Sequence, residues 1–185
     1  MRSRFIHIFA LLAFLALFLI PTQRLETAIE HSSAFKLTGD GSIYLIDTHT
    51  QEKLSIIYRD NMGRYDDEVL EAIHHTLRCH GRSEEYPISL KLIELIDHIQ
   101  DHFNAKEVHV ISGYRSPDYN AHLRQRSSRV AHNSLHMRGL AMDIRMPGVD
   151  KHALGEFARS LKIGGIGVYP KSNFVHIDVG PVRNW

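Results

Sequence analysis

Two short stretches that alternate between aliphatic and polar residues constrain the fold of this chain most strongly. The first runs from Leu140 to Met146, and the second from Phe174 to Val179. Side chains point alternately to the two faces of a strand, so one face of each stretch can pack on an apolar core. The polar residues of both stretches then emerge on the opposite face, which neighbouring strands would share.

Three side chains are predicted to converge on that shared face. Asp143 and His176 lie on it, and His136 lies in the turn that leads into the first strand. Two imidazoles and one carboxylate leave a fourth position open for water, as in a catalytic zinc site. The 14 histidines also make accidental His/Asp spacings common. The matching strand position of His176 nevertheless favours a metal site.

The composition limits both the class of protein and the residue types that could bind a metal. A hydrophobic fraction of 43% and a charged fraction of 23% are typical of a globular protein, and 185 residues suffice for one domain. The formal net charge of +1 gives no field that would attract nucleic acid. Cys79 is the single cysteine, which excludes an intrachain disulfide and a cysteine-based zinc site. Any metal must therefore be held by His, Asp or Glu.

Residues 1–34 are predicted to be a signal peptide or an N-terminal membrane anchor. Met1–Arg4 is basic and Phe5–Ile20 is almost wholly apolar, which is the order of a secretory signal. The apolar run is short for a membrane span, and no convincing cleavage site follows it closely. Both alternatives stay open. The domain of residues 35–185 is expected to be exported to the periplasm, with possible anchoring at the inner membrane.

That domain is predicted to have an α+β fold, with N-terminal helices and a mostly antiparallel sheet that carries the site. A hairpin is expected to precede the helices. The predicted hairpin strands are 42–47 and 54–58, the helices 66–79, 88–103, 116–126 and 150–161, and the other strands 107–112, 140–146 and 174–179. Ser116 as N-cap and Pro117 in the first turn mark the start of one helix.

Two further residues are candidates for catalysis. Arg115 directly follows a predicted strand, where a guanidinium could bind a carboxylate or stabilise an oxyanion; an exposed surface arginine is the alternative. Asp178 shares the strand face of His176 and could act as a base or orient a metal ligand. An ion pair of Asp178 with Arg138 or Arg183 is the alternative interpretation.

Three motifs together resemble those of the zinc D-Ala-D-Ala carboxypeptidase superfamily: Ser112–Pro117, Ser134-x-His136-x-x-Gly139-x-Ala141-x-Asp143 and Val175–Asp178. The stretch from Gly164 to Trp185 is more specifically similar to murein endopeptidases of the K type. The resemblance covers roughly residues 42–185.

This resemblance implies the superfamily's fold, Zn2+ as cofactor, and a peptidase that hydrolyses amide bonds in peptidoglycan stems or cross-links. It implies His136, Asp143 and His176 as the zinc ligands. It also implies that Arg115 holds substrate and stabilises the developing oxyanion, and Ser134 is a second substrate-binding candidate.

The general base stays open. Many superfamily members carry an acidic residue three positions before the last zinc ligand or a histidine two before it, where this chain has Asn173 and Phe174. Neither side chain can accept a proton, so Asp178 and His132 are the candidates. Without a base, the chain could be a zinc-containing module that binds peptidoglycan or a protein. A histidine-rich metal carrier is a third alternative, but its ligands should cluster in tracts.

Overall fold

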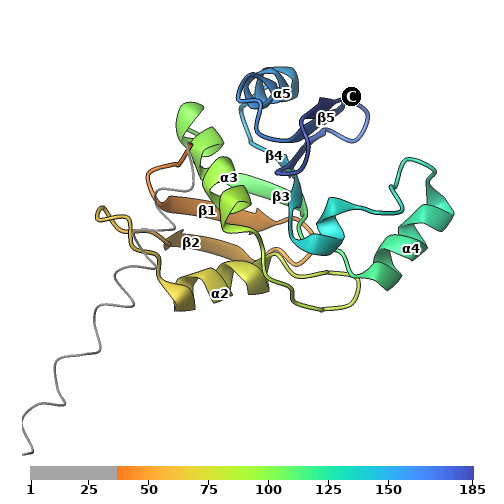
Figure 1. Ribbon diagram of the computed structural model, residues 1–185, viewed down its shortest axis with the longest axis horizontal. Helices are drawn as coiled ribbons and strands as arrows, with labels where there is room; N and C mark the ends of the chain where they lie inside the picture. Colours follow the sequence, from red (N-terminus) through yellow and green to blue (C-terminus); the bar gives the residue numbers. More distant parts are fainter. Residues whose placement is uncertain (1–36) are drawn as a thin grey trace, which may run out of the picture.

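One sheet of seven strands forms the framework of the computed structural model, which describes residues 37–185 (Figure 1). The predicted signal or anchor of residues 1–34 lies outside this range. The strand order is β2-β1-β3-β4-β6-β5-β7. The pairs β1–β3 and β5–β7 are parallel, and the other pairs are antiparallel. The predicted α+β class with a mostly antiparallel sheet is therefore confirmed.

The hairpin of β1 (Ser42–Asp47) and β2 (Lys53–Ile57) forms one edge of the same sheet that carries the candidate site. The remaining elements, in chain order, are α2 (Asp67–Thr76), α3 (Leu90–His102), β3 (Val108–Ser112), α4 (Pro117–Arg126), the short 3-10 helix η1 (Leu135–Arg138), β4 (Ala141–Arg145), α5 (Lys151–Ser160), β5 (Gly165–Tyr169), β6 (Phe174–Asp178) and β7 (Arg183–Asn184).

Capping side chains explain where three of the helices begin. Asp66 accepts hydrogen bonds from the backbone of the first turn of α2, and Asp150 does the same for α5. Ser116 accepts from the backbone N–H of Tyr119, with Pro117 at the first position of α4, so the predicted cap is confirmed. Each cap satisfies donors that have no partner within the helix.

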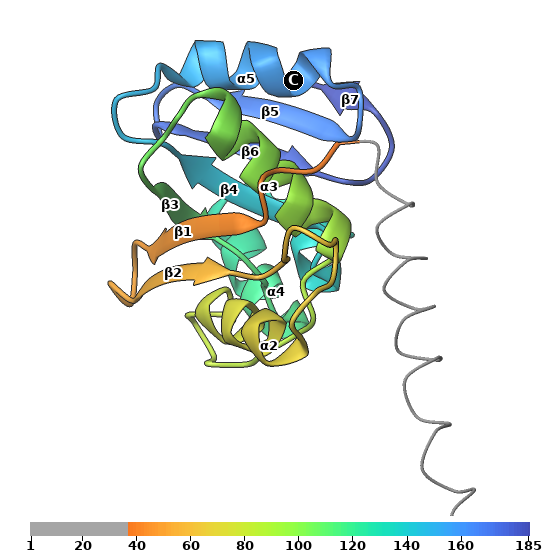
Figure 2. The same ribbon diagram turned by 90° about the vertical axis from the view of Figure 1, so that its left-hand side faces the viewer.

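The apolar core lies between the sheet and the helices that cover it. Figure 2 shows α3 lying across the strands and α5 running alongside β5. Leu92, Ile96 and Ile99 of α3 are fully buried in this core. The core-facing residues of β4 and β6 are buried as well: Met142, Ile144, Val175 and Ile177. The two alternating stretches thus present their aliphatic faces to the core as predicted, and their polar residues project from the other face.

None of the helices between residues 37 and 185 combines the length and the apolar character needed to cross a membrane.

The turn that leads into β4 depends on a glycine, which provides a test of the fold. Gly139 has a φ of +62°, and a Cβ added there would lie 2.1 Å from the carbonyl oxygen of Pro87. Gly148 has a φ of +83°, but nothing lies within 4 Å of an added Cβ. We expect Gly148→Ala to lower the free energy of unfolding by about 1 kcal/mol, from backbone strain alone.

Gly139→Ala adds a backbone clash to the same strain, so we expect a loss of about 3 kcal/mol or more in urea denaturation. Equal losses in the two variants would contradict the close approach of Gly139 to Pro87.

Candidate metal centre

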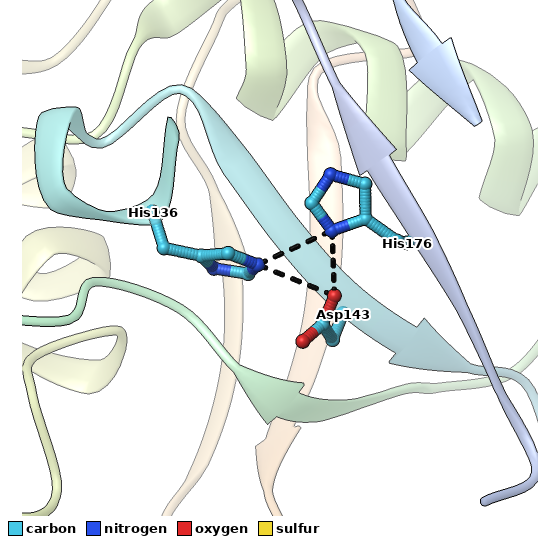
Figure 3. Close-up of side chains that lie close together, drawn as sticks. All are labelled: His136, Asp143 and His176. Carbon is cyan, nitrogen blue, oxygen red and sulfur yellow. Dashed lines mark hydrogen bonds and ion pairs between the residues drawn. The ribbon is translucent and has the colours of Figure 1, made fainter. Parts of the chain in front are cut away.

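The three predicted ligands come from two paired strands and the turn before them. In the antiparallel β4–β6 pair, Asp143 lies directly opposite His176. His136 lies in η1, which ends at Gly139 in a left-handed conformation and turns the chain into β4. Figure 3 shows the three side chains pointing to a common centre. All three are buried, with His176 the most exposed at 9%.

The facing atoms of these side chains are close enough to share one ion. Asp143 Oδ1 lies 2.8 Å from His176 Nδ1 and 3.2 Å from His136 Nε2. The two imidazole nitrogens are 3.2 Å apart. Zinc–nitrogen bonds of about 2.0–2.1 Å in a tetrahedron place neighbouring ligand atoms about 3.3 Å apart. The spacing fits a tetrahedral metal ion with three protein ligands.

In each imidazole ring, the hydrogen bond of the outer nitrogen determines which nitrogen carries the proton. The Nδ1–H of His136 donates to the carbonyl oxygen of Gly113 over 2.8 Å. The Nε2–H of His176 donates to Asp178 Oδ2 over 3.0 Å. Because both oxygens only accept, the inward-facing nitrogens of the neutral rings keep their lone pairs. Three acceptors then converge in a buried place, and a cation satisfies all of them.

The pKa shifts within the group agree with that need for positive charge. Burial lowers the pKa of His136, which favours its neutral, ligating form. Burial also acts to lower the pKa of His176, but hydrogen bonds to Asp143 and Asp178 outweigh it and raise that pKa. Burial acts to raise the pKa of Asp143, yet the two histidines and Arg115 hold it well below its ordinary value. The group keeps its carboxylate and favours one added positive charge.

Arg115 reaches the same centre from the loop after β3. Its Nη2–H donates to Asp143 Oδ2, and its Nε–H donates to Ser112 Oγ over 2.8 Å. The guanidinium therefore holds the second oxygen of Asp143 and leaves Oδ1 to face the histidines. Arg115 also lines the cleft above the group. The position at a strand end predicted its approach to the cleft, but not its contact with a metal-ligand candidate.

Asp178 lies behind His176, with no exposed surface. Besides the imidazole of His176, its carboxylate accepts from the backbone N–H groups of Gly165 and Gly180, each over 2.9 Å, and from Arg183 Nη2 over 2.6 Å. Burial acts to raise the pKa of Asp178, but the hydrogen bonds from His176, Gly165 and Gly180 outweigh it and lower the pKa. This geometry supports an orienting role together with the Arg183 ion pair, and it disfavours a role as base.

The two positions where the superfamily resemblance would place a base have structural roles in this chain. Asn173 has a φ of +52°, a turn conformation that asparagine tolerates better than most residues. Phe174 stacks on Tyr169, with 4.6 Å between ring centroids. His132 is exposed, and its ring contacts the side chain of Asn133. Within the described part of the chain, the residues that line the cleft include no carboxylate or imidazole beyond the three metal-ligand candidates.

The metal group opens into a cleft of about 440 Å³. Ser134, the other predicted substrate-binding residue, lines this cleft beside η1. Sequence reasoning assigned no role to Arg129, Tyr169 or Trp185, which also line this cleft. Trp185 is the single tryptophan of the chain and the last residue of the stretch that resembles murein endopeptidases, but no role was predicted for it.

With this geometry established, comparison with known proteins identifies the family. The family described as peptidoglycan L,D-endopeptidase MepK matches residues 38–185. The chain belongs to this family. Its membership confirms the resemblance carried by the motifs and the prediction that the chain is a peptidase. Peptidases of the family are metal-dependent, which agrees with a His/Asp/His group that could hold a metal ion.

Two relatives illustrate the similarity. Peptidoglycan L,D-endopeptidase MepK of Escherichia coli (strain K12) is 39% identical over 142 residues, which cover 76% of this chain and 78% of that protein. Probable peptidoglycan L,D-endopeptidase MepK of Haemophilus influenzae is 36% identical over 139 residues, or 74% of each chain. In both cases the aligned part covers about three quarters of this chain.

The orienting role of Asp178 can be tested through metal affinity. Asp178→Asn keeps the size of the side chain. However, its new amide N–H would face the N–H groups that now donate to the carboxylate, and it could not accept a hydrogen bond from them. We expect the affinity for zinc to fall ~10–100-fold, as when other outer partners of ligating histidines are removed. Competition with a chromophoric chelator measures this, and exposed Asp118→Asn on α4 is the matched control. Wild-type affinity in Asp178→Asn would contradict the role.

Proposed function

We propose that this chain is a zinc-dependent peptidoglycan L,D-endopeptidase that cleaves amide bonds in peptide stems or cross-links during cell-wall remodelling. The observation that carries the proposal is the buried His136, Asp143 and His176 group, whose three acceptors converge at the floor of an open cleft. The E. coli and H. influenzae relatives, named as a peptidoglycan L,D-endopeptidase and a probable one, support the choice of substrate.

In this proposal His136 Nε2, His176 Nδ1 and Asp143 Oδ1 hold the zinc ion. Bound zinc would supply a Lewis acid that polarises an amide carbonyl and makes water more acidic. Gly113 and Asp178 fix the two imidazole rings through their outer nitrogens. This preorganisation matters because a catalytic geometry that is already in place needs no reorganisation during the reaction.

Arg115 and Ser134 complete the proposed substrate site. The guanidinium of Arg115 keeps further N–H groups beyond those that contact Asp143 and Ser112. These groups can stabilise the carbonyl oxygen of the scissile amide as it gains negative charge, or hold a substrate carboxylate. Ser134, buried on the wall of the same cleft, can position the peptide backbone through its hydroxyl group.

A second candidate function is a zinc-containing module that binds peptidoglycan without cleaving it. It is favoured by the turn and stacking roles of Asn173 and Phe174, since these residues stand where many members of the superfamily that the chain resembles carry the base. If the chain is an enzyme, the proton must leave through a group that enters the cleft with substrate or solvent. Binding to sacculi without release of any muropeptide would favour this second function.

The basic and apolar order of residues 1–34 supports a signal peptide or an anchor at the inner membrane, and residues 35–185 would then act in the periplasm. A periplasmic location would place the cleft beside the peptidoglycan, the proposed substrate. No nucleic-acid partner is expected, because the formal net charge is only +1.

The enzymatic function is tested by digesting purified sacculi and analysing muropeptides by liquid chromatography and mass spectrometry. We expect zinc-loaded wild type to convert cross-linked dimers to monomers, and chelator or His136→Ala to abolish this conversion. His152→Ala is the matched histidine control and should keep activity, because His152 is exposed on α5 and does not line the cleft. An unchanged muropeptide profile with zinc-loaded wild-type protein would contradict the endopeptidase proposal.

Arg115 is tested by separating catalysis from metal binding. At saturating zinc we expect Arg115→Gln to lower kcat by ~10²–10³-fold, the usual cost of removing one oxyanion donor. Arg115→Lys keeps the charge but not the forked geometry, so its kcat should lie between those of wild type and Arg115→Gln. If extra zinc restores full activity to Arg115→Gln, Arg115 acts only by holding Asp143.

A further inference from the structure

The aromatic ring of Trp185 borders the metal cleft on the side of His176. The two ring centroids are 5.3 Å apart. The indole Nε1–H donates to the hydroxyl of Tyr169 over 2.9 Å, and the guanidinium carbon of Arg183 lies 5.2 Å from the ring centroid. A Cβ added at Gly167 would lie 2.4 Å from the indole ring, so the strand beneath has room for it only because that residue is glycine.

A second hollow of about 590 Å³ adjoins the cleft, and Trp185 lines both. It shares Arg129, Tyr169, Ser172 and Trp185 with the metal cleft, so the two hollows meet along these residues. Val168 and Pro170 add apolar surface to its wall, and Lys171 lies at its rim. We call this second hollow, defined by Arg129, Tyr169, Lys171, Ser172 and Trp185, the tryptophan subsite.

The positively charged side chains at the tryptophan subsite lack ion-pair partners among residues 37–185, whereas those beside the metal group are paired. Arg115 is paired with Asp143, and Arg183 is paired with Asp178. Arg129 and Lys171 are exposed, and within residues 37–185 no carboxylate lies in ion-pair range of either one. Their charge is therefore available to an anionic group that enters the hollow.

We propose that the tryptophan subsite binds the second peptide strand of a cross-linked substrate, through an aliphatic arm and a free carboxylate. The inference rests on the proposed function, because an endopeptidase must hold chain on both sides of the scissile bond. The metal cleft would hold one side, and the adjoining hollow offers room for the other. The aliphatic arm would lie on the rings of Tyr169 and Trp185, and the carboxylate would face Arg129 and Lys171.

Trp185 makes this proposal directly measurable, because it is the single tryptophan of the chain. Zinc-loaded full-length protein is mixed rapidly with a cross-linked muropeptide dimer, and tryptophan fluorescence is recorded before turnover. The uncross-linked monomer and a dimer with amidated carboxylates are titrated in parallel. We expect the dimer to change the fluorescence at lower concentration than the monomer or the amidated dimer.

Charge variants then test the carboxylate contact. We expect Arg129→Gln and Lys171→Gln each to raise KM and the fluorescence midpoint for the dimer roughly two- to fivefold, the range for an exposed ion pair. The value of kcat should stay within about twofold, since neither residue contacts the metal group, and higher salt should shrink the effect. Lys53→Gln removes the same charge from β2, at the far edge of the sheet, and should change nothing.

The failure of this inference is distinguishable from failure of the proposed function. If wild type cleaves the dimer but the double variant Arg129→Gln/Lys171→Gln keeps wild-type KM and midpoint, the tryptophan subsite is overturned and the endopeptidase stands. An equal shift in Lys53→Gln would likewise overturn it, because the effect would then be nonspecific. If the dimer changes the fluorescence but is not cleaved, the subsite is supported and the endopeptidase fails.

Discussion

The pairing of Asp143 with His176 across β4 and β6 is the constraint on which the rest of this site depends. A register shift of one residue in either strand would turn its polar side chains into the core and its aliphatic ones toward the cleft. The core prevents this shift, because Met142, Ile144, Val175 and Ile177 are all buried beneath the same two strands. Hydrophobic burial thus fixes the positions of two hydrophilic groups that would otherwise be costly to bring together.

Close backbone packing around Asp178 extends that constraint to the orientation of the imidazole ring. A Cβ added at Gly164 would lie 1.7 Å from the carbonyl oxygen of Asp178, and one at Gly165 would lie 2.5 Å from its carboxylate. The glycines allow β5 to approach β6 closely enough for the backbone N–H of Gly165 to hold the carboxylate. The carboxylate in turn holds His176, so the direction of the lone pair at the metal centre depends on residues well behind it.

The residues after β6 contact both Asp178, behind the metal group, and the wall of the cleft. Arg183 forms an ion pair with Asp178, and its guanidinium also lies over the indole ring of Trp185. The same short segment therefore neutralises the charge behind the metal group and forms the border between the two hollows. A change in this segment would act on metal geometry and on substrate contacts together.

Much of this architecture follows from local sequence. The predicted helices contain the observed ones, since capping residues such as Ser116 and the apolar periodicity act within a few turns. Period-two alternation was enough to select Asp143 and His176 as neighbours on one face, because side-chain direction in a strand is a local property. Alternation could not say that the hairpin of β1 and β2 joins the same sheet, since strand order depends on distant pairings.

The sequence by itself determined the fold class, the four helices, most of the strands and the three residues that could bind metal, whereas β5 and β7 were not among the predicted strands. Only the tertiary structure decided the roles around them: Arg115 on the second oxygen of Asp143, and Asp178 behind His176 instead of in the cleft. Trp185 beside the metal group also depends on the fold, because a parallel β5–β7 pair brings it there. These contacts join residues far apart in the chain, and no local pattern encodes the hydrogen-bond geometry that distinguishes a ligand, a base and a supporting group.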